Sequence, residues 1–133
     1  MKFKKGNRVE VLRQTDLSSG AWWCGEIIPR NGQTFQVRYD GSQCLSNVES
    51  VSRKVIRPCP LPTDVSDDWT VCDLVEMFND LCWKITIVLK VSRGNHYMVR
   101  LIGLSTELQV NKANIRMRQL WLDDKWVVIG KVR

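Results

Sequence analysis

The chain has 133 residues, of which 44% are hydrophobic and 26% are charged, with a formal net charge of +6. This balance is typical of a folded chain rather than a disordered one, and the length allows one average domain or two very small ones. No apolar run approaches the roughly 20 residues of a membrane span, and polar residues follow Met1–Gly6. We therefore expect neither a membrane helix nor a secretory signal.

Residues that commonly support catalysis are scarce. The single histidine, His96, belongs to the turn-like run Arg93–His96, where a polar turn residue is the ordinary interpretation. The five cysteines are an odd number without a Cys-x-x-Cys pair, which favours reduced, partly buried thiols in an intracellular protein. The sequence also lacks a Gly-rich phosphate loop and a metal-binding helix motif. We expect a non-catalytic protein that needs no cofactor and no metal.

The first half of the chain predicts short β-strands. Apolar and polar residues alternate in Phe35–Tyr39, which is typical of a strand with one buried face. Asn31–Gly32 and Asp40–Gly41 predict tight turns before and after it, and Pro29 is expected to end the preceding strand. About four or five such strands are enough for one small closed barrel.

A proline-rich segment divides the chain. Arg57–Thr63 contains three prolines at alternate positions, which exclude a helix and a central strand and favour an extended connector. We place the first domain at residues 1–60, the connector at 61–68 and the second domain at 69–133. A barrel of about sixty residues is marginal alone, so we expect the two barrels to pack as one rigid unit.

The second half repeats the first in four blocks that occur in the same order, which indicates an internal duplication. Ile85–Leu89 is apolar on both faces, so we expect both to be buried, and Leu120–Ile129 predicts a hairpin with its bend at Asp123–Asp124. The matched blocks are Gly6–Val11 with Cys72–Met77, Ala21–Cys24 with Leu81–Lys84, Phe35–Gly41 with Tyr97–Gly103, and Val55–Pro58 with Asn114–Met117.

Together these blocks resemble tandem Agenet domains, the plant branch of the Tudor-like family. The resemblance covers nearly the whole chain and ends on Trp121–Val127. It implies an all-β fold of two small Tudor-like (SH3-like) five-stranded barrels in tandem, no catalysis and a nuclear location. Some relatives recognise methylated lysine on histone tails, and others of similar type are described as RNA-binding.

A methyl-lysine pocket needs two or three aromatic faces, with a carboxylate where the ammonium keeps a proton. The family pattern places Trp22 and Trp23 at the start of the second strand and Tyr39 at the end of the third. Neighbours on a strand point to opposite faces, so one tryptophan can wall the pocket while the other enters the core. The resemblance favours Trp22 for the pocket, with Asp40 or Asp16 as the carboxylate, although a core role stays open for Trp22 and Tyr39.

The second half departs from this pattern. In the block alignment Trp22 is matched by Cys82, Tyr39 by Leu101 and Asp40 by Ile102. The aromatic residues Phe78 and Trp83 are the second half's candidates for a contribution to the pocket. We expect the second barrel to support the first and to line a groove between the barrels.

The charge is concentrated in the first half. Residues 1–62 carry ten Lys or Arg against five Asp or Glu, and residues 63–133 carry ten against nine. We expect a monomeric module of a longer nuclear protein that binds a histone-tail peptide with methylated lysine, and a plain interaction adaptor is a further possibility. The alternative is DNA or RNA binding. Its candidate contacts are Lys4, Lys5, Arg8, Arg13, Arg30, Arg53 and Lys54, with Lys2 and Arg57 beside them.

Overall fold

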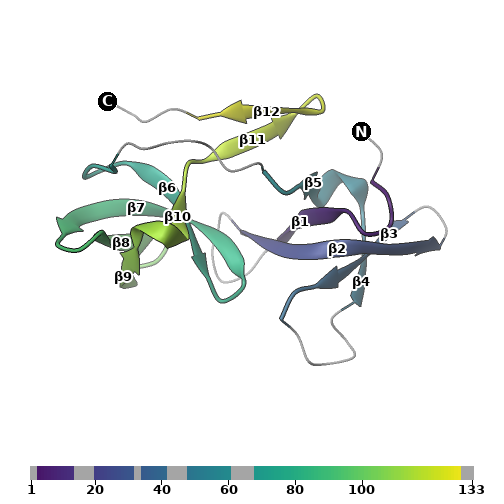
Figure 1. Cartoon of the computed structure of the whole chain (residues 1–133), viewed down its shortest axis with the longest axis horizontal. Coiled ribbons are helices and arrows are strands. Elements are labelled where there is room, and N and C mark those ends of the chain that lie inside the picture. The colour runs from purple at the N-terminus through teal and green to yellow at the C-terminus, as the bar shows by residue number, and fades with distance from the viewer. Residues whose placement is uncertain (1–2, 14–19, 32–33, 42–47, 61–67, 130–133) are drawn as a thin grey trace.

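The computed structural model describes residues 3–13, 20–31, 34–41, 48–60 and 68–129. The predicted all-β fold of two Tudor-like barrels is confirmed. Figure 1 shows two curled sheets side by side, with the last hairpin lying across the join between them.

The first barrel curls because one long strand pairs differently along its length. β2 pairs with β1 over its first part and with β3 over its second part. β1 also pairs with β5, and β3 pairs with β4. The elements are β1 (Arg8–Arg13), β2 (Ala21–Asn31), β3 (Thr34–Tyr39), β4 (Val48–Val51), the 3-10 turn η2 (Arg53–Val55) and β5 (Ile56–Pro58).

The core of the first barrel confirms the alternation predicted for β3. Phe35, Val37 and Tyr39 are buried, and they pack with apolar residues of β1, β2, β4 and β5. Gly25 is needed where β2 crosses β3, because a Cβ there would lie 2.6 Å from the carbonyl oxygen of Arg38.

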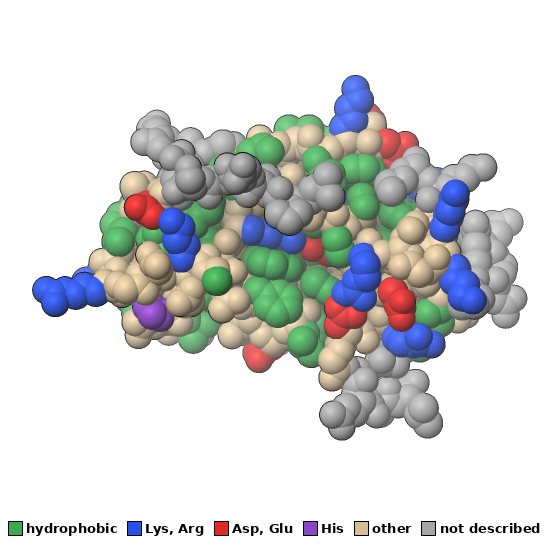
Figure 2. Space-filling view, viewed as in Figure 1, with side chains coloured by type: hydrophobic (Ala, Val, Ile, Leu, Met, Phe, Trp, Pro, Cys, Tyr) green, Lys and Arg blue, Asp and Glu red, His purple; other side chains and the backbone are tan. Residues whose placement is uncertain are grey.

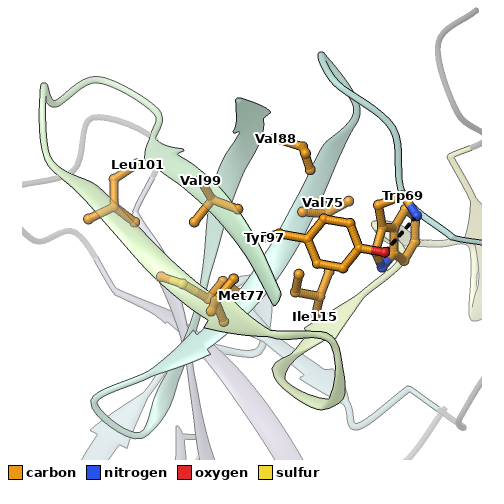
Figure 3. Packing of buried hydrophobic residues seen from close by; sticks show 9 residues of the cluster. Trp69, Val75, Met77, Val88, Tyr97, Val99, Leu101 and Ile115 are labelled. Atoms are coloured by element: carbon orange, nitrogen blue, oxygen red, sulfur yellow. Dashed lines mark hydrogen bonds between the residues drawn. The ribbon is translucent and has the colours of Figure 1, made fainter. Parts of the chain in front are cut away.

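The second barrel repeats the same pairing. Its elements are β6 (Leu74–Asn79), β7 (Cys82–Ser92), β8 (His96–Leu101), β9 (Glu107–Asn111), the 3-10 turn η3 (Lys112–Asn114) and β10 (Ile115–Arg116). In its core, Trp69 closes one end, and its backbone N–H donates a 3.3 Å hydrogen bond to the Tyr97 hydroxyl (Figure 3).

The two barrels form one unit, as expected. β2 and β7 pair antiparallel, with Trp22 opposite Trp83 and Trp23 opposite Cys82, which joins both barrels into one 10-stranded sheet. The predicted C-terminal hairpin is confirmed as β11 (Gln119–Leu122) and β12 (Lys125–Val128). Its bend is at Asp123–Asp124, whose φ angles are 49° and 59° as a type I′ turn requires.

Two local predictions are wrong. β2 runs through Pro29 to Asn31, because a register shift between Ile28 and Asn31 makes a bulge that tolerates proline. Ile85–Leu89 is fully buried on one face only, since its alternate residues lie on a partly covered outer face. Gly32 of the predicted first turn and residues 61–67 of the predicted connector lie outside the described residues.

Candidate functional site

The strand register changes how the two halves correspond. Leu12 is opposite Trp22, and Phe78 is opposite Trp83, at equivalent positions of the two barrels. Trp22 therefore corresponds to Trp83 rather than to Cys82, so this block of our sequence alignment was shifted by one residue.

Trp22 and Tyr39 lie on opposite faces of the sheet. Tyr39 is opposite Gly25, which is three residues along β2 from Trp22, and an odd spacing reverses the face. The ring of Trp22 instead stacks on the guanidinium of Arg57, at 3.7 Å from the Arg57 Cζ to the ring centroid. The structure thus does not bring Trp22 and Tyr39 into one pocket, as the sequence interpretation required.

Trp22 instead borders an ion-pair network between the barrels. Glu10 accepts a 3.0 Å hydrogen bond from Nε of Arg57, and Glu76 accepts one of 2.7 Å from Nε of Arg116. Arg116 also donates across the join to both carboxylate oxygens of Glu10. Glu10, Arg57 and Glu76 are buried. We call these four residues the inter-barrel network.

Phe78 and Trp83 also belong to this join. The Trp83 ring lies 3.9 Å from the Cζ of Arg116, and the Phe78 and Trp83 rings pack with centroids 5.1 Å apart. Trp22 and Trp83 thus each cover one arginine of the inter-barrel network. Their position gives all three aromatic residues a role in holding the barrels together.

A different pair of rings comes together on the other face of the first sheet. Trp23 and Tyr39 occupy diagonal positions of β2 and β3, where large side chains meet. The Cζ of Arg13 lies 5.5 Å from the Trp23 ring centroid and 5.1 Å from that of Tyr39. One guanidinium therefore lies over both rings.

A carboxylate completes this site. Glu49 of β4 accepts a 3.2 Å hydrogen bond from the Tyr39 hydroxyl, and its Oε2 lies 3.5 Å from Nη2 of Arg13. Burial, and then the negative charge of Glu49, raise the pKa of Tyr39 to about 12. We call Trp23, Tyr39 and Glu49 the aromatic pocket; it lies at the edge of the first barrel's core, where Tyr39 is 8% exposed and Trp23 is partly buried.

The sequence interpretation assigned this carboxylate to other residues. Asp40 is held in a two-point ion pair by Arg8 at the outer surface, and Asp16 lies outside the described residues. Glu49 was missed because only the β3–β4 register, which sets it opposite Val37, brings it near Tyr39. No local motif marks that position.

The second barrel does not reproduce the aromatic pocket. At the corresponding positions the registers place Lys84, Leu101 and Leu108, with Asn79 where the first barrel has Arg13. Lys84 donates a 2.9 Å hydrogen bond to the side-chain oxygen of Asn79. These positions of the second barrel therefore offer no aromatic face to a cation.

Several of the basic candidates are engaged by acids. Arg8 pairs with Asp40, Arg13 with Glu49 and Arg57 with Glu10. On the face seen in Figure 2, Lys and Arg side chains of the first barrel lie beside Asp and Glu rather than forming an unbroken basic surface. The other candidates with described side chains are exposed, namely Lys4, Lys5, Arg53 and Lys54, while the Arg30 side chain lies outside the described part.

A groove of about 930 Å³ runs between the first barrel and the C-terminal hairpin. Its lining includes Trp22, Arg53 and Arg57 of the first barrel, with Trp121 and Asp123 of the hairpin. It lies on the opposite sheet face from the aromatic pocket.

Within the described ranges, no cluster of three or more His, Cys, Asp or Glu side chains could hold a metal ion. Cys24, Cys59, Cys72 and Cys82 are free thiols. Burial raises the pKa of Cys24 to about 12 and that of Cys59 to about 11, which keeps both thiols protonated near neutral pH. The described part of the chain contains no helix with the length and hydropathy of a membrane span.

Two Arabidopsis thaliana proteins are similar in sequence. Protein AGENET DOMAIN (AGD)-CONTAINING P1 is 26% identical over 136 residues, which cover 97% of this chain and 26% of that protein. DUF724 domain-containing protein 6 is 27% identical over 135 residues, which cover 93% of this chain and 19% of that protein. The chain thus spans about a quarter or less of the length of these relatives.

Solved structures share the fold of the whole chain. The crystal structure of Arabidopsis thaliana AGDP1 AGD34 superposes with a TM-score of 0.83 at 20% identity, covering 96% of this chain and 90% of that one. The ADCP1 tandem Agenet domain 3-4 gives a TM-score of 0.79 at 21% identity, covering 96% and 89%. The sequence profile of the Agenet domain matches residues 6–61. The first half of the chain is thus similar to an Agenet domain, and the chain as a whole has the fold of tandem Agenet domains.

Proposed function

We propose that this chain is a chromatin reader module that binds a histone-tail peptide through the aromatic pocket, with a methylated lysine as the side chain that is read. The observation that carries the proposal is the position of Arg13, whose guanidinium lies within 5.5 Å of two ring centroids. The pocket already holds a cation of the protein itself.

The chemistry of the pocket suits a methylated ammonium group. Two ring faces each contribute about 0.5–2 kcal/mol to binding a cation, depending on how far it is desolvated. Glu49 adds a negative charge and can accept a hydrogen bond from an ammonium that keeps a proton. The Glu49 side chain is 41% exposed, so a peptide side chain can reach it from solvent.

The same proposal covers the longer protein that contains the module and its location in the cell. The chain spans 26% and 19% of two longer relatives, which fits a module within a longer protein. We place that protein in the nucleus, because histone tails are found there. Asp40 and Glu26 lie against Arg8 and Arg38, so these two arginines are neutralised locally and repel a basic tail less.

The test is a titration of methylated and unmodified histone-tail peptides against the wild-type chain and single variants. We expect Trp23→Ala and Tyr39→Ala to abolish binding of the methylated peptide. Trp121→Ala, on the hairpin, should leave it unchanged. Circular dichroism must show that each variant is folded, and Glu49→Gln tests the pocket at a residue whose exposure makes misfolding a minor concern.

Equal binding of the Trp23→Ala and wild-type chains would refute the proposal. Parallel titrations with duplex and single-stranded nucleic acid test the alternative. If nucleic-acid binding dominates, the logarithm of the affinity falls steeply with the logarithm of the salt concentration. Lys4→Ala or Lys54→Ala should then reduce this slope.

A further inference from the structure

We propose that Arg13 is an internal occupant of the aromatic pocket, which the ligand must displace before it can bind. The inference rests on the proposed function, since it describes how the same pocket is opened. Arg13 is the last residue of β1, and its guanidinium lies over both rings while approaching the Glu49 carboxylate. These are the contacts that a peptide cation would make.

The fold does not require an arginine at this position. The second barrel has the same strands and register, and there Asn79 takes the place of Arg13. Asn79 and Lys84 form a hydrogen-bonded pair, so the second barrel forms the same strand pairing without an arginine at this position. The contacts of Arg13 thus follow from the rings and carboxylate that only the first barrel has.

The occupant is held weakly enough to leave. The Arg13 side chain is 42% exposed, and its ion pair with Glu49 is open to solvent and screened by salt. Cation–π contacts at exposed sites are also modest. The open pocket is therefore a minor but accessible state, and the apparent dissociation constant equals the intrinsic one divided by the open fraction.

Removing the occupant should strengthen binding. We expect Arg13→Gln and Arg13→Ala to bind a methylated histone-tail peptide roughly threefold to tenfold more tightly than wild type, as loss of a weak competitor predicts. The matched control is Arg8→Gln, which removes the same charge from an exposed ion pair on the same strand. A general relief of charge repulsion would raise affinity equally in both variants, and that outcome would overturn the inference.

A second measurement needs no peptide. The Nε–H of Arg13, detected by NMR in the free protein, should be shifted upfield by the ring currents of Trp23 and Tyr39. Tetramethylammonium chloride should return it toward its random-coil position, while sodium chloride at equal ionic strength should do so less. A random-coil signal in the free protein contradicts the inference even if the peptide binds. A shifted, displaceable signal without peptide binding in any variant supports Arg13 as the occupant and refutes the proposed function instead.

Discussion

Arg116 of the second barrel donates hydrogen bonds of 2.8 and 3.0 Å to the two carboxylate oxygens of Glu10 in the first barrel. Arg57 donates to the same carboxylate from within the first barrel. The Glu10 side chain is 1% exposed, so one buried anion binds an arginine from each half of the chain, with Glu76 as the second anion of the network. This contact between β1 and β10 links the two barrels in addition to the β2–β7 pairing.

Replacing that anion should destabilise the whole module. In Glu10→Gln, Arg57 and Arg116 lose one of their two shared counterions in a buried site and keep only Glu76, and removing a partner from such a site costs about 3–5 kcal/mol. Urea denaturation measures the loss as a fall in the free energy of unfolding. Glu26→Gln is the control, because its pair with Arg38 is exposed and contributes less than about 1 kcal/mol. Equal effects of the two variants would mean that the inter-barrel network does not hold the barrels together.

The fold was largely predictable because its signals are local. The alternation in Phe35–Tyr39, the duplicated blocks and the Asp123–Asp124 bend each depend on a few neighbouring residues. The pocket was not predictable in the same way. Which of Trp22 and Trp23 faces Tyr39 depends on strand register, and a shift of one residue moves each side chain to the other face.

The other site residues were not predictable either, because pairing between distant strands brings them together. Glu49 is near Tyr39 only because β4 pairs with β3 in one particular register. Arg13 was read as part of a basic surface, and nothing in the sequence near it indicates that two rings lie under its guanidinium. The resemblance favours Trp22 for the pocket, but the residue that stacks on its ring, Arg57, is distant in the sequence.

Gly25→Ala should destabilise the first barrel. The added Cβ would lie 2.6 Å from the Arg38 carbonyl oxygen and 2.7 Å from Cγ1 of Val37, so β2 and β3 must separate. Overpacking of this kind costs about 1–3 kcal/mol, measured by thermal or urea unfolding. Thr86→Ala tests the equivalent site of the second barrel, where a side chain is already accommodated. An unchanged stability of Gly25→Ala would show that the crossing of β2 and β3 relaxes freely.

Stability should fall in alkali. The pKa values of Cys24 and Cys59 are raised from 9.0 to about 12 and about 11, chiefly by burial. Above pH 9 the unfolded thiols ionise while the folded ones stay protonated, so the unfolded state binds fewer protons and the free energy of unfolding decreases up to about pH 11–12. Urea denaturation at pH 8 and pH 10 measures the difference. It should shrink in the double variant Cys24→Ala/Cys59→Ala, and an unchanged difference would assign the alkaline loss to other groups.

Glu49 should determine which methylation state the aromatic pocket prefers. A mono- or dimethylated lysine keeps an N–H that can donate to the carboxylate, whereas a trimethylated lysine has none. Hydrogen bonds to charged groups contribute about 1.5–3 kcal/mol, so Glu49→Gln should weaken dimethyl-lysine binding by roughly tenfold or more. Trimethyl-lysine binding should weaken less, because it loses only the Coulomb attraction.

Calorimetric titration of the three methylation states against both chains measures this preference as a ratio of dissociation constants. Tyr39→Phe is the companion variant, because it keeps the ring and removes the hydroxyl that donates to Glu49 at 3.2 Å. Freed from that hydrogen bond, the carboxylate can turn fully toward the ligand, so the preference for dimethyl-lysine should persist or increase. If Glu49→Gln weakens all three peptides by the same factor, the carboxylate attracts charge without reading the N–H, and the preference must come from the size of the space between Trp23 and Tyr39.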